Sequence, residues 1–165
     1  MPAVLSFPDP VNEKAARVVA GVVALTGVAI LATGWHWLLV PLAYGFWARV
    51  LTGPTLSPLG RPAMRGIAPR LGPPKYVPGP PKRFAQGIGA ALTTVAAVLS
   101  LGLDADGAAD ALVALLVVAA TLESALALCL GCHMFALLMR AGLVPEATCA
   151  RCADPWAGRA QSSRS

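Results

Sequence analysis

The sequence predicts an all-α integral membrane protein with four transmembrane helices and a basic, Pro/Gly-rich cytoplasmic loop between the second and third helices. Hydrophobic residues make up 56% of the chain and charged residues 13%, against about 45–50% and 25% in soluble domains. The chain is therefore too apolar for an ordinary soluble domain. Its apolar residues also fall in continuous runs of bilayer length, as expected for membrane spans rather than a compact core.

The chain divides into three parts. Residues 1–14 form a polar N-terminal tail, residues 15–142 a four-helix membrane domain, and residues 143–165 a C-terminal tail. The N-terminal tail lacks the basic-then-apolar order of a cleavable signal peptide, so we expect it to be retained. Asn12 is suited to cap a helix that begins at Glu13.

The four predicted spans differ in length. A helix needs about 17–25 residues to cross a bilayer, and the second span only reaches the lower limit. Three glycines of the third span predict close packing against a neighbouring helix: Gly87, Gly89 and Gly102. His36, in the turn between the first two spans, is expected to be solvated. The predicted spans are residues 15–34, 35–51, 84–103 and 108–132.

The loop at residues 52–83 holds nine prolines, five glycines and six basic residues. A long helix cannot continue through that proline density, so we expect at most a short interfacial helix at residues 59–71. The turns at residues 34–37 and 104–110 contain no Lys or Arg. The positive-inside rule then places the loop and both termini in the cytoplasm, with the bilayer as the chain's main partner.

All four cysteines lie in the last third of the chain, as two Cys-x2-Cys pairs. The first pair is Cys129 and Cys132, and the second is Cys149 and Cys152, with sixteen residues between the pairs. This spacing is typical of a four-thiolate zinc site. A reducing cytosol disfavours a permanent disulfide, so metal binding, redox cycling and sulfur transfer all stay open.

The predicted helix at residues 108–132 places the first pair near its C-terminal end. The helix dipole raises the pKa of a thiol there, whereas nucleophilic thiols favour helix N-termini. Cys149 and Cys152, in the tail beyond, are therefore the better candidates for the nucleophile. The helical segment after the first pair should end near Gly142, a residue suited to a C-cap.

Glu123 lies inside the fourth predicted span, six residues before Cys129. A carboxylate is costly within a bilayer, so Glu123 is a candidate functional residue, here as part of a proton path. The alternative is a protonated structural acid that bonds to a neighbouring polar group. Six residues place Glu123 and Cys129 on different faces of a helix, so direct acid–base service to the thiols would need a bridge from a neighbouring helix.

Several segments combine proline, glycine and charge in a recognisable order. They are residues 9–13, 53–58, 68–75, 80–86, 129–132, 138–140 and 144–146. Together they resemble the bacterial membrane-protein family catalogued as domain of unknown function 4395, over about residues 9–152. The resemblance implies a small multi-pass protein of the bacterial cytoplasmic membrane, often encoded near thioredoxin-like or sulfurtransferase proteins. It implies no established activity.

Two functions fit these features. The first is a membrane thiol–disulfide or sulfur-relay protein that uses Cys129, Cys132, Cys149 and Cys152 with a cytoplasmic thioredoxin- or rhodanese-like partner. The alternative is a non-enzymatic scaffold or small transporter subunit in which the same four cysteines hold a structural zinc ion. The sequence contains no Walker loop, catalytic-triad order or dinucleotide fingerprint. It also lacks the basic stripe with interleaved aromatics that is typical of nucleic-acid binding.

Overall fold

The structure is a computed structural model that describes residues 10–53 and 56–145. Five helices dominate it: α1 (Glu13–Thr33), α2 (Leu39–Thr52), α4 (Gly79–Ala97), α5 (Asp106–Leu126) and α6 (Leu130–Arg140). The shorter helical elements are η1 (His36–Leu38), α3 (Gly60–Pro62), η2 (Ala63–Ile67), η3 (Ala68–Leu71) and η4 (Val98–Gly102). Two short strands, β1 (Val11–Asn12) and β2 (Tyr76–Val77), complete the fold.

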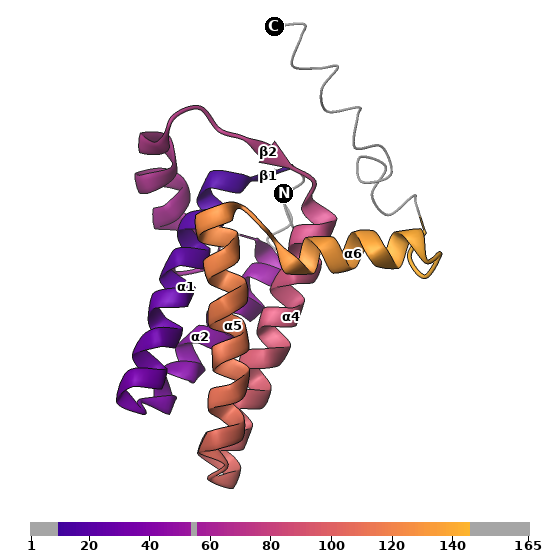
Figure 1. Cartoon of the computed structure of the whole chain (residues 1–165). Coiled ribbons are helices and arrows are strands. Elements are labelled where there is room, and N and C mark those ends of the chain that lie inside the picture. Colours follow the sequence, from indigo (N-terminus) through magenta and orange to yellow (C-terminus); the bar gives the residue numbers. More distant parts are fainter. Residues whose placement is uncertain (1–9, 54–55, 146–165) are drawn as a thin grey trace, which may run out of the picture.

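Helices α1, α2, α4 and α5 form an elongated bundle (Figure 1). The main contacts run between α1 and α5, between α2 and α4, and between α4 and α5. Apolar side chains fill the interior, with Ile30, Leu39 and Val113 almost fully buried. Helix α6 instead lies crosswise against α4, at the end of the bundle that also carries the two strands.

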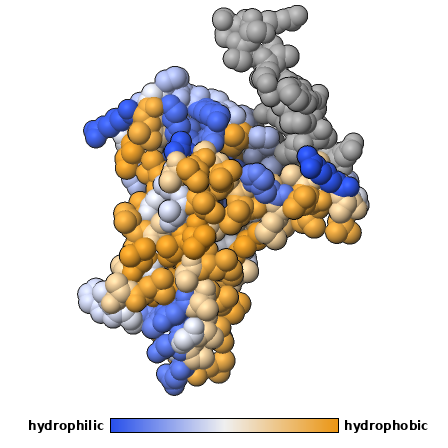
Figure 2. Space-filling view, viewed as in Figure 1, coloured by the Kyte–Doolittle hydropathy of each residue, from blue (hydrophilic) through white to orange (hydrophobic). Residues whose placement is uncertain are grey.

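Three helices in the described part of the chain are long and apolar enough to cross a bilayer. They are Glu13–Thr33, Gly79–Leu103 and Asp106–Leu126, with mean hydropathies of 2.1, 1.6 and 1.9. On the face seen in Figure 2, apolar side chains cover the middle of the bundle, and hydrophilic residues gather towards its two ends. Helix α2 has 14 residues, which is shorter than a typical span. The fourth crossing therefore stays a prediction.

The fourth predicted span is wrong at its C-terminal end, because α5 stops at Leu126 instead of continuing to Cys132. Ala127 adopts a left-handed backbone conformation, with φ of 57°, and its N–H donates to the carbonyl of Leu122. The Arg17 guanidinium donates to the carbonyls of Ser124 and Ala125, at 3.0 and 3.2 Å. A cation on these carbonyls stabilises the negative end of the helix dipole, so the helix is capped before the first cysteine.

The start of α1 agrees with the sequence. The Lys14 amide donates to the Asn12 side chain at 3.0 Å, which confirms the predicted N-cap. Strand β1 pairs antiparallel with β2, and the Glu13 amide donates to the Lys75 carbonyl at 2.8 Å. Glu13 and Lys75 also form a 2.8 Å ion pair. These contacts hold the far end of the proline loop against the first helix.

The proline loop contains consecutive helical turns from Gly60 to Leu71, formed by α3, η2 and η3. Their buried side is made of small residues, Ala63 and Ala68, whereas the arginines of this segment are exposed. The turns lie where the short interfacial helix is expected. The segment after α6 also follows its prediction, because Gly142 has φ of 75° directly beyond the end of that helix.

Close packing of the third span is confirmed at one glycine and not at the other two. A Cβ atom at Gly89 would lie 2.2 Å from the Phe46 ring of α2. A Cβ at Gly87 or Gly102 would meet nothing within 4 Å, so the expectation is wrong at these two positions. Gly89 therefore lets α2 and α4 approach closely.

At the end of the bundle away from the two strands, His36 connects two segments of the chain. The His36 Nε2 atom lies 2.9 Å from an Asp110 oxygen, and its Nδ1 atom lies 3.5 Å from Asp106. The His36 side chain is mostly buried, so the expectation that it is merely solvated is wrong. Its contacts connect the α1–α2 turn with the start of α5.

Candidate functional site

The first cysteine pair lies at the N-terminus of a helix. Cys129 is the N-cap of α6, in an extended conformation, and its Sγ accepts a hydrogen bond from the Cys132 amide at 3.4 Å. The His133 amide donates to the Cys129 carbonyl at 3.1 Å and closes the first turn. The prediction that this pair lies at a helix C-terminus is wrong, because α5 has already ended at Leu126 and a new helix starts at Leu130.

The two thiols are electrostatically different. The pKa of Cys129 is lowered chiefly by a hydrogen bond from the Cys132 thiol; the Lys82 ammonium and the Cys132 amide also lower it, against burial and Glu123. The pKa of Cys132 is raised because its thiol donates that hydrogen bond and because the group is buried. Cys129 is therefore the thiol that ionises first, and the thiolate is the nucleophilic form.

A buried ion pair lies beside the thiols. Lys82 Nζ donates to a Glu123 carboxylate oxygen at 2.5 Å, and the two side chains are only 8% and 14% exposed. Lys82 comes from the first turn of α4 and Glu123 from the last turns of α5. Lys82 thus links α4 to Glu123 of α5, and its positive charge favours the thiolate forms of both Cys129 and Cys132.

Sequence reasoning missed Lys82 as a site residue. It belongs to the basic residues of the predicted loop, which were assigned to membrane orientation as a group. Lys82 lies two residues before the predicted span at residues 84–103, and the helix in fact starts earlier, at Gly79. A lysine in the first turn of a helix points into the bundle or towards solvent according to the packing of that helix, which the sequence does not specify.

Arg49 is a second buried cation that the sequence did not single out. Its Nε donates to Gln86 at 2.8 Å, and its Nη1 lies 3.4 Å from the Ser57 hydroxyl. The guanidinium also lies over the Phe46 ring, 4.5 Å from the centroid. Arg49 is near the end of the predicted second span, and its role depends on the neighbouring helix α4.

Cys129 opens onto a cavity of about 170 Å³ between α4, α5 and the start of α6. Glu123 and Gln86 also line the cavity, and most of the remaining wall is apolar. Such a cavity admits a small molecule, and it brings that molecule to one thiol and one carboxylate. We call it the thiol cavity.

Helix α6 is positioned by tight contact with α4. A Cβ atom at Gly131 would lie 2.5 Å from the Cβ of Ala85, so only glycine fits at this position. The Phe84 and Phe135 rings also contact each other, tilted by 56° and with centroids 5.7 Å apart. These contacts determine where the N-terminus of α6, and with it Cys129, lies.

The second cysteine pair, Cys149 and Cys152, lies outside the described residues. The four-cysteine zinc site and the choice of this pair as nucleophile therefore stay predictions. Within residues 10–53 and 56–145, no group of three His, Cys, Asp or Glu side chains is close enough to hold a metal ion. Cys129 and Cys132 are free thiols.

The fold and site together define a class of protein: a helical bundle with three helices of membrane-crossing length and a Cys-x2-Cys motif at the N-terminus of a crosswise helix. The chain belongs to the family described as domain of unknown function DUF4395, whose profile matches residues 11–140. This confirms the family that the sequence segments suggested. No curated protein and no solved structure matches the chain.

Proposed function

We propose that this protein is a membrane thiol–disulfide or sulfur-relay protein in which Cys129 is the nucleophile and Cys132 the second thiol. The position of Cys129 at the N-cap of α6, where its sulfur accepts the Cys132 amide hydrogen bond, supports this assignment most directly. The positive end of a helix dipole stabilises a thiolate. The positive charge of the nearby Lys82 ammonium also favours the Cys129 thiolate.

In thiol–disulfide exchange, the Cys129 thiolate attacks one sulfur of a partner's disulfide and releases the other sulfur as a thiolate. The Cys132 thiol then loses its proton and attacks Cys129 Sγ, which releases the second partner thiolate. The products are a Cys129–Cys132 disulfide and a dithiol partner, so two electrons and two protons pass from one dithiol to the other. A cytoplasmic thioredoxin-like protein has the chemistry of such a partner.

Sulfur transfer uses the same nucleophile. The Cys129 thiolate attacks the outer sulfur of a persulfide on a rhodanese-like partner. The partner's S–S bond breaks, its cysteine leaves as a thiolate, and Cys129 becomes the persulfide. Cys132 can then attack the inner sulfur of that persulfide, which releases hydrosulfide and forms the disulfide. In both versions of the proposal, Cys129 attacks the partner's sulfur first and Cys132 then attacks Cys129.

Access to Cys129 decides what can react with it. Cys129 is 6% exposed, so a small thiol-reactive molecule can meet it through the thiol cavity, whereas a protein cannot do so directly. We propose that α6 swings away from α4 about residues 127–129 when a protein partner docks. The short connection between α5 and α6 supports this proposal, because it contains the left-handed residue Ala127 and no regular structure.

For the membrane arrangement, we propose four crossings, with α2 and η1 forming the short second one, and with both termini in the cytoplasm. The charge distribution supports this orientation. The described Lys and Arg residues belong to the end with the thiols, whereas Asp104, Asp106 and Asp110 lie at the opposite end. Positive charge near membrane spans marks the cytoplasmic side.

The proposed nucleophile is tested by trapping. Cys132→Ser should accumulate a mixed disulfide between Cys129 and a thioredoxin-like partner, because the second thiol that resolves it is missing. Cys129→Ser should give none, and a Cys149→Ser/Cys152→Ser chain should still react. Adducts are read by non-reducing gel electrophoresis and mass spectrometry. Equal adduct formation by Cys129→Ser and Cys132→Ser would overturn the assignment.

Metal content separates the relay from the zinc scaffold. The relay predicts purified, reduced protein without stoichiometric zinc and with a first cysteine pair that oxidises reversibly. One zinc ion per chain, together with four thiols that do not react until a chelator removes the metal, would support the scaffold instead. The measurement is elemental analysis combined with a thiol titration.

A further inference from the structure

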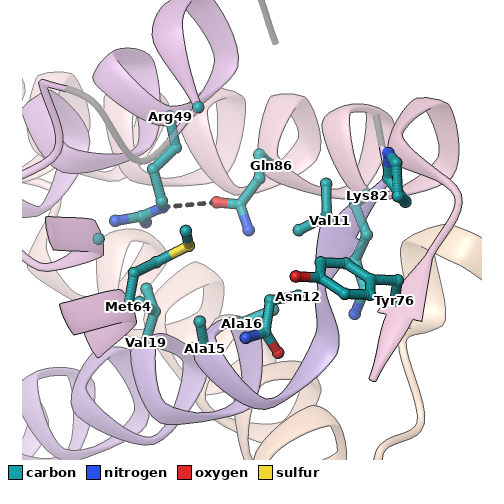
Figure 3. Close-up of a pocket in the computed structure, with 13 residues that line it drawn as sticks. Val11, Asn12, Ala15, Ala16, Val19, Arg49, Met64, Tyr76, Lys82 and Gln86 are labelled. Carbon is teal, nitrogen blue, oxygen red and sulfur yellow. Dashed lines mark hydrogen bonds between the residues drawn. The ribbon is translucent and has the colours of Figure 1, made fainter. Parts of the chain in front are cut away.

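A second cavity lies at the cytoplasmic end of the proposed orientation, beneath the β1–β2 pair. It has a volume of about 130 Å³ and is enclosed by α1, α2, α4 and the helical turns of the proline loop. Figure 3 shows Arg49 and Lys82 reaching it from different helices, with Gln86 between them. We call it the arginine cavity. Cys129 and Cys132 do not line it.

The Arg49 guanidinium is incompletely paired in this cavity. Arg49 is only 6% exposed, and its Nε and Nη1 atoms contact Gln86 and Ser57. Its Nη2 atom is buried and has no hydrogen-bond partner among residues 10–53 and 56–145. A guanidinium has five N–H donors and no acceptor, so the unused donors can only be satisfied by an added acceptor.

Among the described residues, Arg49 also has no ion-pair partner. Lys82 forms its ion pair with Glu123, whereas no carboxylate of the described segments lies within ion-pair distance of Arg49. The two acceptors that Arg49 has, Gln86 and Ser57, are neutral. A buried charge is costly unless it is both paired and hydrogen-bonded. Within the described segments, the cavity therefore contains a buried cation without an ion-paired anion, because Glu123, whose charge acts on Arg49, is paired with Lys82.

The rest of the wall limits the chemistry of that anion. Val11, Val19 and Met64 contribute apolar surface, and Tyr76 contributes a ring. The volume is close to that of an engineered cavity of about 150 Å³ that binds benzene, so the cavity admits an anion with about six carbon atoms. A fully hydrated inorganic anion would leave these apolar walls facing its water shell.

We propose that the arginine cavity binds an organic anion whose carboxylate or phosphate-ester head accepts a hydrogen bond from Arg49 Nη2 and whose apolar part lies against Val19 and Met64. The head group can come from a free amphiphile or from a membrane lipid. Guanidinium groups suit both heads, since they bind planar carboxylates and phosphates with paired N–H donors. This site goes beyond the thiol relay and does not depend on it.

The test uses the full chain with all four cysteines changed to serine, so that thiol chemistry contributes nothing. The protein is placed in zwitterionic lipid nanodiscs, and its thermal unfolding is followed with acetate, butyrate, hexanoate or chloride at constant ionic strength. We expect hexanoate to raise the unfolding temperature at the lowest concentration of the four. Arg49→Gln should weaken the apparent affinity for hexanoate at least tenfold.

Two further variants make the result specific. Arg65→Gln removes an exposed arginine of the same loop and should bind hexanoate like the parent chain. Ala16→Leu keeps Arg49 but places a larger side chain in the cavity wall, so it should weaken the binding of hexanoate. This variant tests the site independently if Arg49→Gln does not fold. Equal stabilisation of the parent and Ala16→Leu, or of the parent and a folded Arg49→Gln, would overturn the proposal.

Nanodiscs containing phosphatidylglycerol distinguish the two sources. If a lipid head fills the cavity, this lipid should stabilise the parent more than Ala16→Leu and should abolish the response to hexanoate. If the ligand is a free amphiphile, hexanoate should act equally in both bilayers. Either result supports an anion site. The proposal fails if neither hexanoate nor phosphatidylglycerol stabilises the parent chain more than Ala16→Leu or a folded Arg49→Gln.

Discussion

At the scale of single residues, Lys82 and Glu123 act on the Cys129 thiol in opposite directions. The lysine ammonium favours the thiolate, whereas the carboxylate of Glu123 disfavours it. The two side chains also neutralise each other across a 2.5 Å contact. The pair can therefore set the pKa of the nucleophile within a narrow range without leaving a net charge beside it.

Removing Lys82 and removing Glu123 should therefore shift the pKa of Cys129 in opposite directions. Lys82→Met should raise the pKa of Cys129 and Glu123→Gln should lower it, because an opposite charge nearby favours ionisation and a like charge disfavours it. The measurement is the pH dependence of the alkylation rate of Cys129 in a Cys149→Ser/Cys152→Ser chain. The midpoint moves to higher pH in the first variant and to lower pH in the second.

Two controls accompany this measurement. Lys75→Met removes an exposed lysine and should leave the midpoint unchanged. Breaking one side of a buried pair costs about 3–5 kcal/mol of stability, so the double variant Lys82→Met/Glu123→Gln should fold better than either single variant and have an intermediate midpoint. Midpoints that move in the same direction in both single variants would show that the pair does not act on Cys129 electrostatically.

Ala127 gives a second prediction at this scale. A left-handed conformation costs an L-residue about 1–2 kcal/mol, a cost that glycine avoids. Ala127→Gly should therefore stabilise the protein by up to about 1 kcal/mol. Ala125→Gly, two residues earlier and inside α5, should destabilise it by a similar amount. Thermal unfolding in detergent measures both. Destabilisation by both glycines would contradict a helix end at this position.

At the scale of elements, the position of α6 depends on the contact of Gly131 with α4. The Cys129 sulfur lies at the start of this helix, so any movement of α6 changes both the exposure of the thiol and its distance from Lys82. One face of α6 stays outside the bundle, with Leu130, Met134 and Leu137 exposed at helical spacing. We expect this face to contact lipid.

Gly131→Ala should push α6 away from α4. The added methyl group would lie 2.5 Å from the Cβ of Ala85 and 2.6 Å from its Cα, and overpacking of this kind costs about 1–3 kcal/mol. The Cys129 thiol should become more accessible and react several-fold faster with a bulky maleimide. Gly87→Ala is the matched control, because its methyl group would meet nothing within 4 Å and alanine favours a helix by about 1 kcal/mol. Unchanged labelling in Gly131→Ala would show that this contact does not position the thiol.

At the scale of the whole molecule, the bundle has two chemically different ends. One end holds Cys129, Cys132, the proline loop and the basic residues of the described segments, and the other holds three aspartates and His36. Trp35 and Trp37 are exposed near the second end, as is common for aromatic residues at a membrane interface. This asymmetry is the basis of the orientation that we propose in a bilayer.

The orientation predicts which sites an impermeant reagent reaches. In a chain without native cysteines, Thr33→Cys and Gly107→Cys should be labelled in intact cells, because both positions are exposed at the acidic end. Tyr76→Cys, exposed in β2, should be labelled only after the cells are opened. Labelling of Tyr76→Cys in intact cells, with protection of the other two, would reverse the orientation.

The sequence by itself determined the features that depend on local patterns. Continuous apolar runs predicted the three long helices, the Asn12 side chain predicted the start of α1, and Gly142 predicted the turn beyond α6. Each of these follows from a few neighbouring residues whose hydropathy or backbone preference does not change with the rest of the fold. The family, too, was recognisable from short segments, and the profile over residues 11–140 confirms it.

Only the tertiary structure decided the arrangement of the site. Ala127 is a good helix former, so nothing local indicates that α5 ends there; Arg17, more than 100 positions earlier, caps the last carbonyls. Lys82 meets Glu123 across 41 positions, and Arg49 meets Gln86 across 37. Such contacts depend on how whole helices pack. This packing changed the environment of Cys129 from the negative end of one helix dipole to the positive end of another.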